Sequence, residues 1–155
     1  MATLAELERV TRAFNDFVPL NRAMGMKLAE VGEGRGTIEM PWDDRFTGDA
    51  EEGLVHGGVL TALLDAVCGM AAFMGLRDPS VIATVDLRID HLRPAELGAD
   101  LVASAETIRA TRHVLFVRGV AHHGDPAVPV AVATATFAVT APNDQGARSA
   151  GPRTP

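Results

Sequence analysis

The chain has 155 residues, 47% of them hydrophobic, with a formal net charge of −6 and a pI near 5.3. This length favours one domain with a substantial core, and the acidic balance excludes the basic footprint of a nucleic-acid-binding protein. The single cysteine excludes an intrachain disulfide, and no secretory signal precedes the first predicted helix. We therefore expect a cytoplasmic protein, and its slightly positive mean hydropathy, +0.13, suggests a buried subunit interface.

The N-terminal region predicts an amphipathic helix over residues 3–17. Its apolar residues recur at intervals of three and four, and Thr3 with Glu6 forms a capping-box pattern. Pro19 ends this helix, because proline cannot continue a hydrogen-bonded helix. A short second turn is expected over 20–24.

Six later segments have the alternation or the β-branched content of strands. They are 26–33, 36–42, 81–92, 99–108, 113–122 and 128–140. In the strand over 81–92, strict alternation places Val85, Leu87 and Ile89 on one face. It places Asp86, Arg88 and Asp90 on the other. The polar segment 43–53 is expected to be a loop, and 141–155 a disordered tail after a single domain over 1–140.

One long apolar helix over 56–76 lies between the second and third strands. Apolar or small residues occupy every side of this helix, so it is expected to be buried all round. A membrane span is rejected, because a central Asp65 costs about 2.5–3.5 kcal/mol on insertion. Thr61, Asp65 and Gly69 follow at intervals of four and share one face, which therefore holds an acid in a shallow groove.

These elements together predict an α+β fold. Short turns between the strands indicate antiparallel pairing. A strongly curved antiparallel β-sheet wrapped around the one long central apolar helix buries that helix most economically.

The segment containing His56-Gly57-Gly58 and Asp65, with the later strand ATVDLRIDHLRP, resembles the hotdog-fold thioesterases of the PaaI-like type. The resemblance extends from about residue 25 to residue 139. It implies a hotdog fold, hydrolysis of an acyl-CoA thioester to a free acid and coenzyme A, and assembly as homodimers that often pair into homotetramers. Coenzyme A is then part of the substrate, and no separate cofactor or metal is expected.

Thioester hydrolysis needs a base or nucleophile and donors for the developing oxyanion. The glycines at 57 and 58 leave the N–H groups of the helix N-terminus open to a substrate carbonyl. Asp65 would act as general base on water, or as nucleophile through an anhydride. His56 would orient the loop or polarise the carbonyl; a purely structural helix cap is an equal alternative.

Two further positions are implied by the resemblance. The family often carries Asn or Gln shortly before the glycine pair, where this chain has Asp49 and Ala50. Asp49 is an imperfect substitute, because an ionised carboxylate cannot donate a hydrogen bond. Thr84 matches a position where the family often has a small hydroxyl residue beside the acid, although an ordinary strand threonine is an alternative interpretation.

Other reactive residues have simpler interpretations. Cys68 lacks a cationic partner in the sequence and is expected to be a buried inert thiol. His122 and His123 point to opposite faces of a strand and cannot easily share a metal ion, so with Asp125 they indicate a polar turn. Four arginines are candidates for the phosphates of coenzyme A, with solvated surface arginines as the alternative. They are Arg88, Arg93, Arg109 and Arg112.

Two other functions stay open beside the acyl-CoA thioesterase. One is a hotdog dehydratase acting on a 3-hydroxyacyl thioester, whose histidine loop would resemble His-Phe-Pro, a stretch that this sequence lacks. The other is a non-catalytic protein that binds acyl thioesters. For the thioesterase, Gly57 and Asp65 are roughly 12 Å apart along one helix, so we expect each active site to use Gly57 of one chain and Asp65 of a second.

Overall fold

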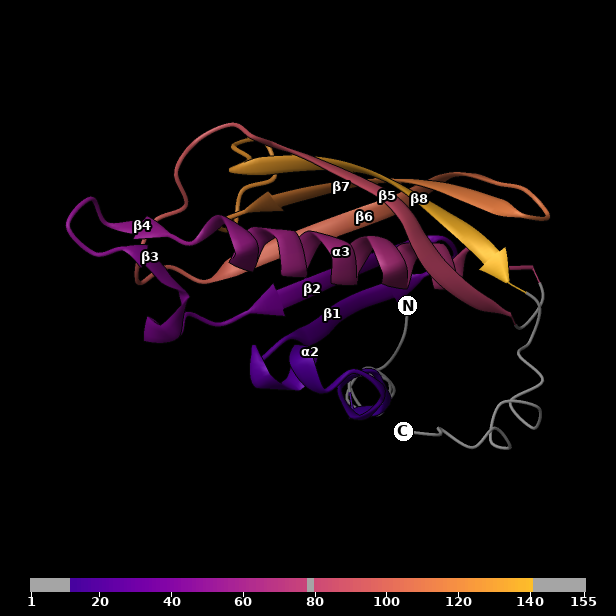
Figure 1. Ribbon diagram of the computed structural model, residues 1–155, viewed down its shortest axis with the longest axis horizontal. Coiled ribbons are helices and arrows are strands. Elements are labelled where there is room, and N and C mark those ends of the chain that lie inside the picture. Colours follow the sequence, from indigo (N-terminus) through magenta and orange to yellow (C-terminus); the bar gives the residue numbers. More distant parts are fainter. Residues whose placement is uncertain (1–11, 78–79, 141–155) are drawn as a thin grey trace, which may run out of the picture.

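The computed structural model describes residues 12–77 and 80–140, and within them six strands form one antiparallel sheet. The order across the sheet is β1-β2-β6-β7-β8-β5 (Figure 1). The strands are β1 (Lys27–Gly32), β2 (Arg35–Met40), β5 (Val81–His91), β6 (Leu101–Ala110), β7 (Val114–His122) and β8 (Ala131–Thr140). All six predicted strands are confirmed, with ends that differ by a few residues.

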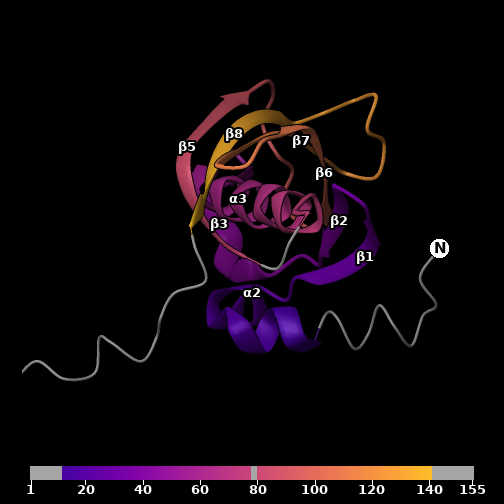
Figure 2. The ribbon, with the colours of Figure 1, turned by 90° about the vertical axis from the view of Figure 1, so that its right-hand side faces the viewer.

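The long helix α3 (Gly57–Met74) lies in the concave side of this sheet. Figure 2, which looks along the helix, shows the strands curving over it on one side. This is the expected hotdog arrangement. By length and composition α3 could cross a membrane, but here it is the core helix of the fold.

The side of the sheet that meets α3 is built largely from small residues. On β8, Ala131, Ala133 and Ala135 alternate with partly exposed residues of the outer face. On β7, an added Cβ at Gly119 would lie 2.8 Å from the Cys68 sulfur, inside the packing distance. Small side chains therefore let the helix approach the sheet closely.

The expectation that α3 is buried on all sides is wrong for the single chain. Leu63, Leu64 and Val67 are fully buried against the sheet, whereas Phe73, on the opposite face, is 54% exposed. Asp65 is likewise only partly covered. The apolar composition of the helix conceals this difference, because its outer face carries alanine, glycine, methionine and phenylalanine, with Asp65 as its one charged residue.

Strand β5 has a β-bulge that corrects the predicted alternation. Thr84 pairs with Phe137 and Asp86 with Thr136, so Val85 is an extra residue without a partner in the register. Val85 is 65% exposed and does not share a buried face with Leu87 and Ile89. The bulge reverses the alternation, so Thr84 and Leu87 both turn toward the helix side.

Residues 12–23 pack on the side of α3 that the sheet leaves open (Figures 1 and 2). Residues 12–17 are helical, and the short helix α2 (Pro19–Ala23) follows, with Pro19 in its first turn. The expected helix over 3–17 is confirmed for its last six residues, and the rest lies outside the described residues. The tail predicted over 141–155 also lies outside them.

The segment predicted as a loop over 43–53 contains regular structure, so that prediction is wrong in part. A single 3-10 turn, η1 (Asp44–Phe46), is followed by a small hairpin of β3 (Thr47–Asp49) and β4 (Leu54–Val55). Strands of two or three residues carry too little alternation to be recognised in a sequence. This hairpin extends beyond the N-terminal end of α3 (Figure 1).

Candidate active site

His56 caps the N-terminus of α3. Its Nδ1 accepts a hydrogen bond of 3.0 Å from the Gly58 N–H, and its own N–H donates to the Phe46 carbonyl. Because Nδ1 accepts, the ring proton of the neutral histidine is assigned to Nε2. A Cβ on Gly58 would lie 2.9 Å from this Nδ1, so the cap requires glycine at position 58. The Gly58 N–H is consequently occupied in this structure.

Gly57 is the first residue of α3, and the described residues provide no acceptor for its N–H. The His91 ring lies beside it, with Cε1 3.7 Å and Nε2 3.9 Å from where a Gly57 Cβ would be. Sequence reasoning missed His91. The alternation predicted over 81–92 places His91 on the same face as Leu87 and Ile89, and this was the signal that could have found it.

Asp65 lies midway along α3, on the face that the sheet leaves open. The Thr84 hydroxyl of β5 donates a hydrogen bond of 3.1 Å to its Oδ1. Thr61, one turn before Asp65, donates its hydroxyl to the Gly57 carbonyl at 3.2 Å. The structure therefore joins Asp65 and Thr84 within one chain, and the bulge at Val85 makes this possible.

The carboxylate and the helix N-terminus do not meet within one chain. Eight residues separate Gly57 from Asp65 along an uninterrupted α-helix, which corresponds to roughly 12 Å along the axis. A single chain thus holds two separate groups of candidate residues, which we name candidate half-sites: Gly57 with His56 and His91, and Asp65 with Thr84.

Asp49 ends β3, in the hairpin beside the first candidate half-site. Its Oδ1 accepts hydrogen bonds from the N–H groups of Glu51 and Glu52, both at 3.0 Å, and so closes the turn. Ala50 is exposed in that turn. A Cβ on Gly48 would lie 2.7 Å from the His56 Cα, so glycine there lets the hairpin contact the cap.

The four candidate arginines do not form one cluster within the chain. Arg88 on β5 forms an ion pair with Asp90 at 3.1 Å, and Arg93 follows the same strand. Arg109 and Arg112 lie at the other end of α3, beside Gly75. The two pairs are therefore separated by nearly the length of the helix.

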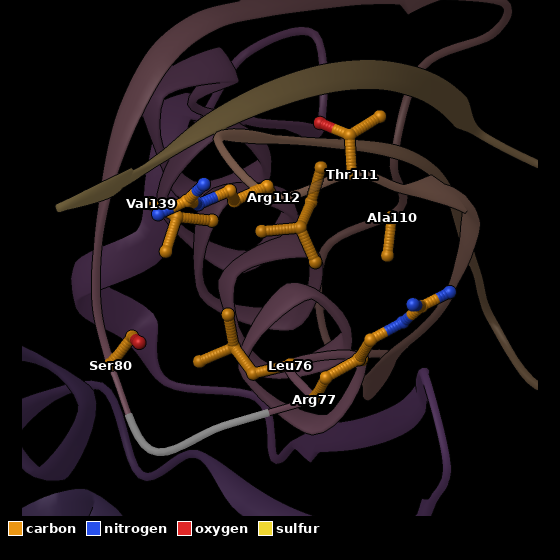
Figure 3. Close-up of a pocket in the computed structure, with 9 residues that line it drawn as sticks. Leu76, Arg77, Ser80, Ala110, Thr111, Arg112 and Val139 are labelled. Carbon is orange, nitrogen blue, oxygen red and sulfur yellow. The ribbon is translucent and has the colours of Figure 1, made fainter. Parts of the chain in front are cut away.

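Arg112 lines a cavity of about 490 Å³ at the C-terminal end of α3. Figure 3 shows Arg77 and Arg112 on different sides of this cavity, with Leu76 in the lower part of the view beside Arg77. Because their guanidinium groups point apart, they do not form a paired site for an anion. This cavity lies away from Asp65 and from the helix N-terminus.

The remaining reactive side chains contribute to the packing of the fold. Cys68 is buried, and burial, with the nearby Asp65 charge, raises the pKa of its thiol to about 12, as expected for an inert thiol. His122 accepts from the Gly124 N–H, and burial lowers its pKa. His123 accepts from the Glu96 N–H through Nε2. Each histidine thus supports a turn, and no group of three metal-ligating side chains occurs in the described part of the chain.

Comparison with known proteins places this geometry in a family. The sequence model of the thioesterase superfamily matches residues 52–130. The chain is 30% identical over 146 residues to the medium/long-chain acyl-CoA thioesterase YigI of Escherichia coli K12, covering 86% of this chain and 93% of that protein.

Two crystal structures show the same fold. A Pseudomonas aeruginosa protein is 36% identical, with a TM-score of 0.74 over 85% of this chain and 97% of its own. A phenylacetic acid degradation-related protein of Ralstonia eutropha is 30% identical, with a TM-score of 0.72 over 86% of this chain and 98% of its own. The chain belongs to the thioesterase superfamily and is a thioester hydrolase with the hotdog fold.

Proposed function

We propose that this protein hydrolyses acyl-CoA thioesters to a free acid and coenzyme A, as a PaaI-like member of the superfamily acting in the cytoplasm. The observation that carries the proposal is the Asp65 carboxylate, held by the Thr84 hydroxyl on the open face of the core helix. The relationship to an acyl-CoA thioesterase over nearly the whole chain supports the choice of substrate.

Asp65 supplies the base or the nucleophile. As a base it takes a proton from water while that water attacks the thioester carbonyl, and as a nucleophile it forms an anhydride that water then opens. In either route the sulfur of coenzyme A leaves as a thiol. The hydrogen bond from Thr84 fixes the carboxylate and leaves its second oxygen to face the reacting group.

The N-terminus of α3 supplies the donors for the oxyanion. The Gly57 N–H is open, and the tautomer of His56 presents an Nε2–H, so these two groups are the proposed donors. Gly58 then serves the site indirectly, because its N–H and its missing Cβ hold the His56 ring. Asp49 stays a candidate for contacting the water or the acyl group.

Each active site is proposed to join two chains. The separation of Gly57 and Asp65 exceeds the reach of a base, which must lie within about 3 Å of its proton or act through one water. Strand β5 pairs with β8 on one side, and no described strand pairs with its other side. Its exposed Val81 and Val85 are typical of an edge that a second copy covers. A two-fold axis there yields two equivalent sites in a homodimer, and dimers can pair again.

The phosphates of coenzyme A need cationic partners near the entrance of such a site. Arg88 and Arg93 lie on or just after the edge strand β5, and Arg109 and Arg112 lie at the opposite end of α3. All four stay candidates, and two copies of the chain bring more than one pair to each site. The proposed reaction uses water and side chains, with no separate cofactor.

A thiol-release assay over a panel of acyl-CoAs tests the proposal against its alternatives. Release of coenzyme A is expected for at least one acyl group. Water loss from a 3-hydroxyacyl thioester would instead indicate the dehydratase, and saturable binding without turnover the non-catalytic protein.

Mixing two inactive variants tests the shared site. Asp65→Asn removes the base, and Gly57→Val places a branched side chain against His91 and blocks the donor. Subunit exchange between them should restore one of the two sites, so activity should reappear on mixing. If heterodimers form and stay inactive, Gly57 and Asp65 do not serve one site across an interface.

A further inference from the structure

A groove of about 550 Å³ lies between α3 and the N-terminal residues 13–21. Those residues lie on the side of α3 away from the sheet (Figures 1 and 2), and they form the roof of the groove. The open face of α3 forms its floor, and Ile82 and Thr84 of β5 form one wall.

The lining is apolar except for Asn21, Asp65 and Thr84. Phe17, Leu20 and Phe73 line the groove and are 91%, 57% and 54% exposed. Burial in a core therefore does not explain these side chains, and exposed apolar surfaces of this kind mark binding sites. Asp65 and Thr84 lie in the same groove, so an apolar group bound there would have the catalytic carboxylate beside it.

Resting on the proposed function, we infer that this groove binds a linear aliphatic acyl chain and that Gly69 sets how long a chain can enter. Gly69 lies one turn after Asp65 on the groove face, and Phe73 lies one turn further. Along the helix axis, Gly69 is roughly 6 Å and Phe73 roughly 12 Å from Asp65. The groove therefore runs from the carboxylate toward the C-terminal end of α3.

The length of the groove indicates the length of the chain. An extended chain advances about 1.2 Å per bond, so passing Gly69 takes about five bonds and reaching Phe73 about ten. Acetyl and butyryl groups end before Gly69, whereas octanoyl to dodecanoyl groups pass over it. A Cβ on Gly69 would make ordinary contact with the Phe137 ring at 3.7 Å, so an alanine there fits without strain and places a methyl group at the groove.

The test measures kcat/KM for the saturated acyl-CoAs from two to twelve carbons, with phenylacetyl-CoA added. For the unmodified protein, kcat/KM should rise from butyryl to decanoyl, by up to about fourfold for each methylene that becomes buried. In Gly69→Leu, the decanoyl-to-butyryl ratio should fall at least tenfold. Gly69→Ala should shift it less and in the same direction, which keeps the test valid if the leucine variant folds poorly.

Ala127→Leu provides a matched control, because it introduces leucine at an exposed turn position that does not line the groove. This control should not change the ratio. An unchanged ratio in both Gly69 variants overturns the inference. If phenylacetyl-CoA is hydrolysed preferentially and kcat/KM does not rise from butyryl-CoA to decanoyl-CoA, the inference that the groove binds a linear acyl chain is overturned. Loss of all activity together with dissociation in sedimentation would show that a second copy, not substrate, contacts the groove.

Failure of the proposed function would be distinguishable from failure of this inference. If no acyl-CoA is hydrolysed, the proposed function fails, and calorimetric binding of decanoyl-CoA and butyryl-CoA to the same variants still tests the groove. Tighter binding of decanoyl-CoA that Gly69→Leu removes would support the groove. Equal binding of the two in all variants would contradict it.

Discussion

The two faces of α3 show how one apolar helix can serve packing and chemistry at once. Leu64 is fully buried toward β7, and its neighbour Asp65 faces the open groove, hydrogen-bonded to Thr84. On the sheet side, leucine and valine side chains of the helix fill the space against the small residues of the strands. On the groove side, Ala62, Ala66 and Gly69 leave space beside Asp65. Stability and activity should therefore respond separately to changes on the two faces.

The largest expected effect is on the groove face. Asp65→Asn keeps the size of the side chain and removes the negative charge, so kcat/KM should fall by about 10²–10⁴-fold. The melting temperature should stay close to that of the unmodified protein, since Asp65 is only partly covered. Turnover assays and thermal denaturation of the same preparation check both parts. Full activity in this variant would make Asp65 structural.

The matching change on the sheet face is Leu64→Ala. A fully buried leucine exchanged for alanine leaves a cavity, and we expect a loss of about 2–5 kcal/mol in the free energy of unfolding. Activity per folded molecule should change little. Denaturant unfolding measures the free energy of unfolding, and dividing the rate by the concentration of active sites gives the activity per folded molecule. A variant that is stable but inactive would show that the two faces are coupled.

A smaller effect is expected where the sheet meets the helix most closely. A Cβ in Gly119→Ala would lie 2.8 Å from the Cys68 sulfur, so the helix or strand must shift, at a cost of about 1–3 kcal/mol. Cys68→Ala removes that sulfur, and the double variant should recover part of the loss. A double-mutant cycle measured by unfolding tests this, and strict additivity would contradict the contact.

The smallest effect again concerns the groove face. Thr84→Val keeps the shape of the side chain and removes the hydroxyl that donates to Asp65. We expect kcat to fall about tenfold, the lower end of the range for one hydrogen bond to a charged group, because Asp65 is only partly covered. Thr84→Ser, which retains a hydroxyl, should recover most of the rate. If Thr84→Val and the unmodified protein turn over equally, Thr84 is an ordinary strand residue.

The sequence was sufficient for much of the fold. Apolar length and glycine placement located α3, and alternation located all six strands of the sheet. Asp65 could be named because an apolar helix seldom carries a carboxylate, and the glycine pair because its spacing from Asp65 resembles the hotdog-fold thioesterases. The groove face could not be recognised, because alanine, glycine, methionine and phenylalanine are equally typical of a core. Its exposure follows from how far the sheet curves, which is a tertiary property.

The site was harder to predict than the fold where it depends on local backbone geometry. The β3–β4 hairpin was missed because strands of two or three residues leave no periodic signal, and the bulge that turns Thr84 to the same side as Leu87 leaves none either. His91 has the predicted parity but belongs to no recognised motif. The hydrogen bond from the Gly58 N–H to His56 Nδ1 was also not predictable, since it depends on how the imidazole ring of His56 is oriented. The partner of each candidate half-site lies on another copy in our proposal, and a single sequence carries no direct sign of it.

Because of the bulge at Val85, the side chains of β5 alternate in one pattern before it and in the opposite pattern after it. Before the bulge, even-numbered residues face α3, and Thr84 reaches the Asp65 carboxylate. After the bulge, odd-numbered residues face α3, and His91 lies beside Gly57. If Val85 were instead paired in register, one continuous alternation would run along the strand, so Thr84 and His91 could not both face α3. The same strand thus supplies one residue to each candidate half-site, and this one inserted residue lets both point to the same side of the sheet.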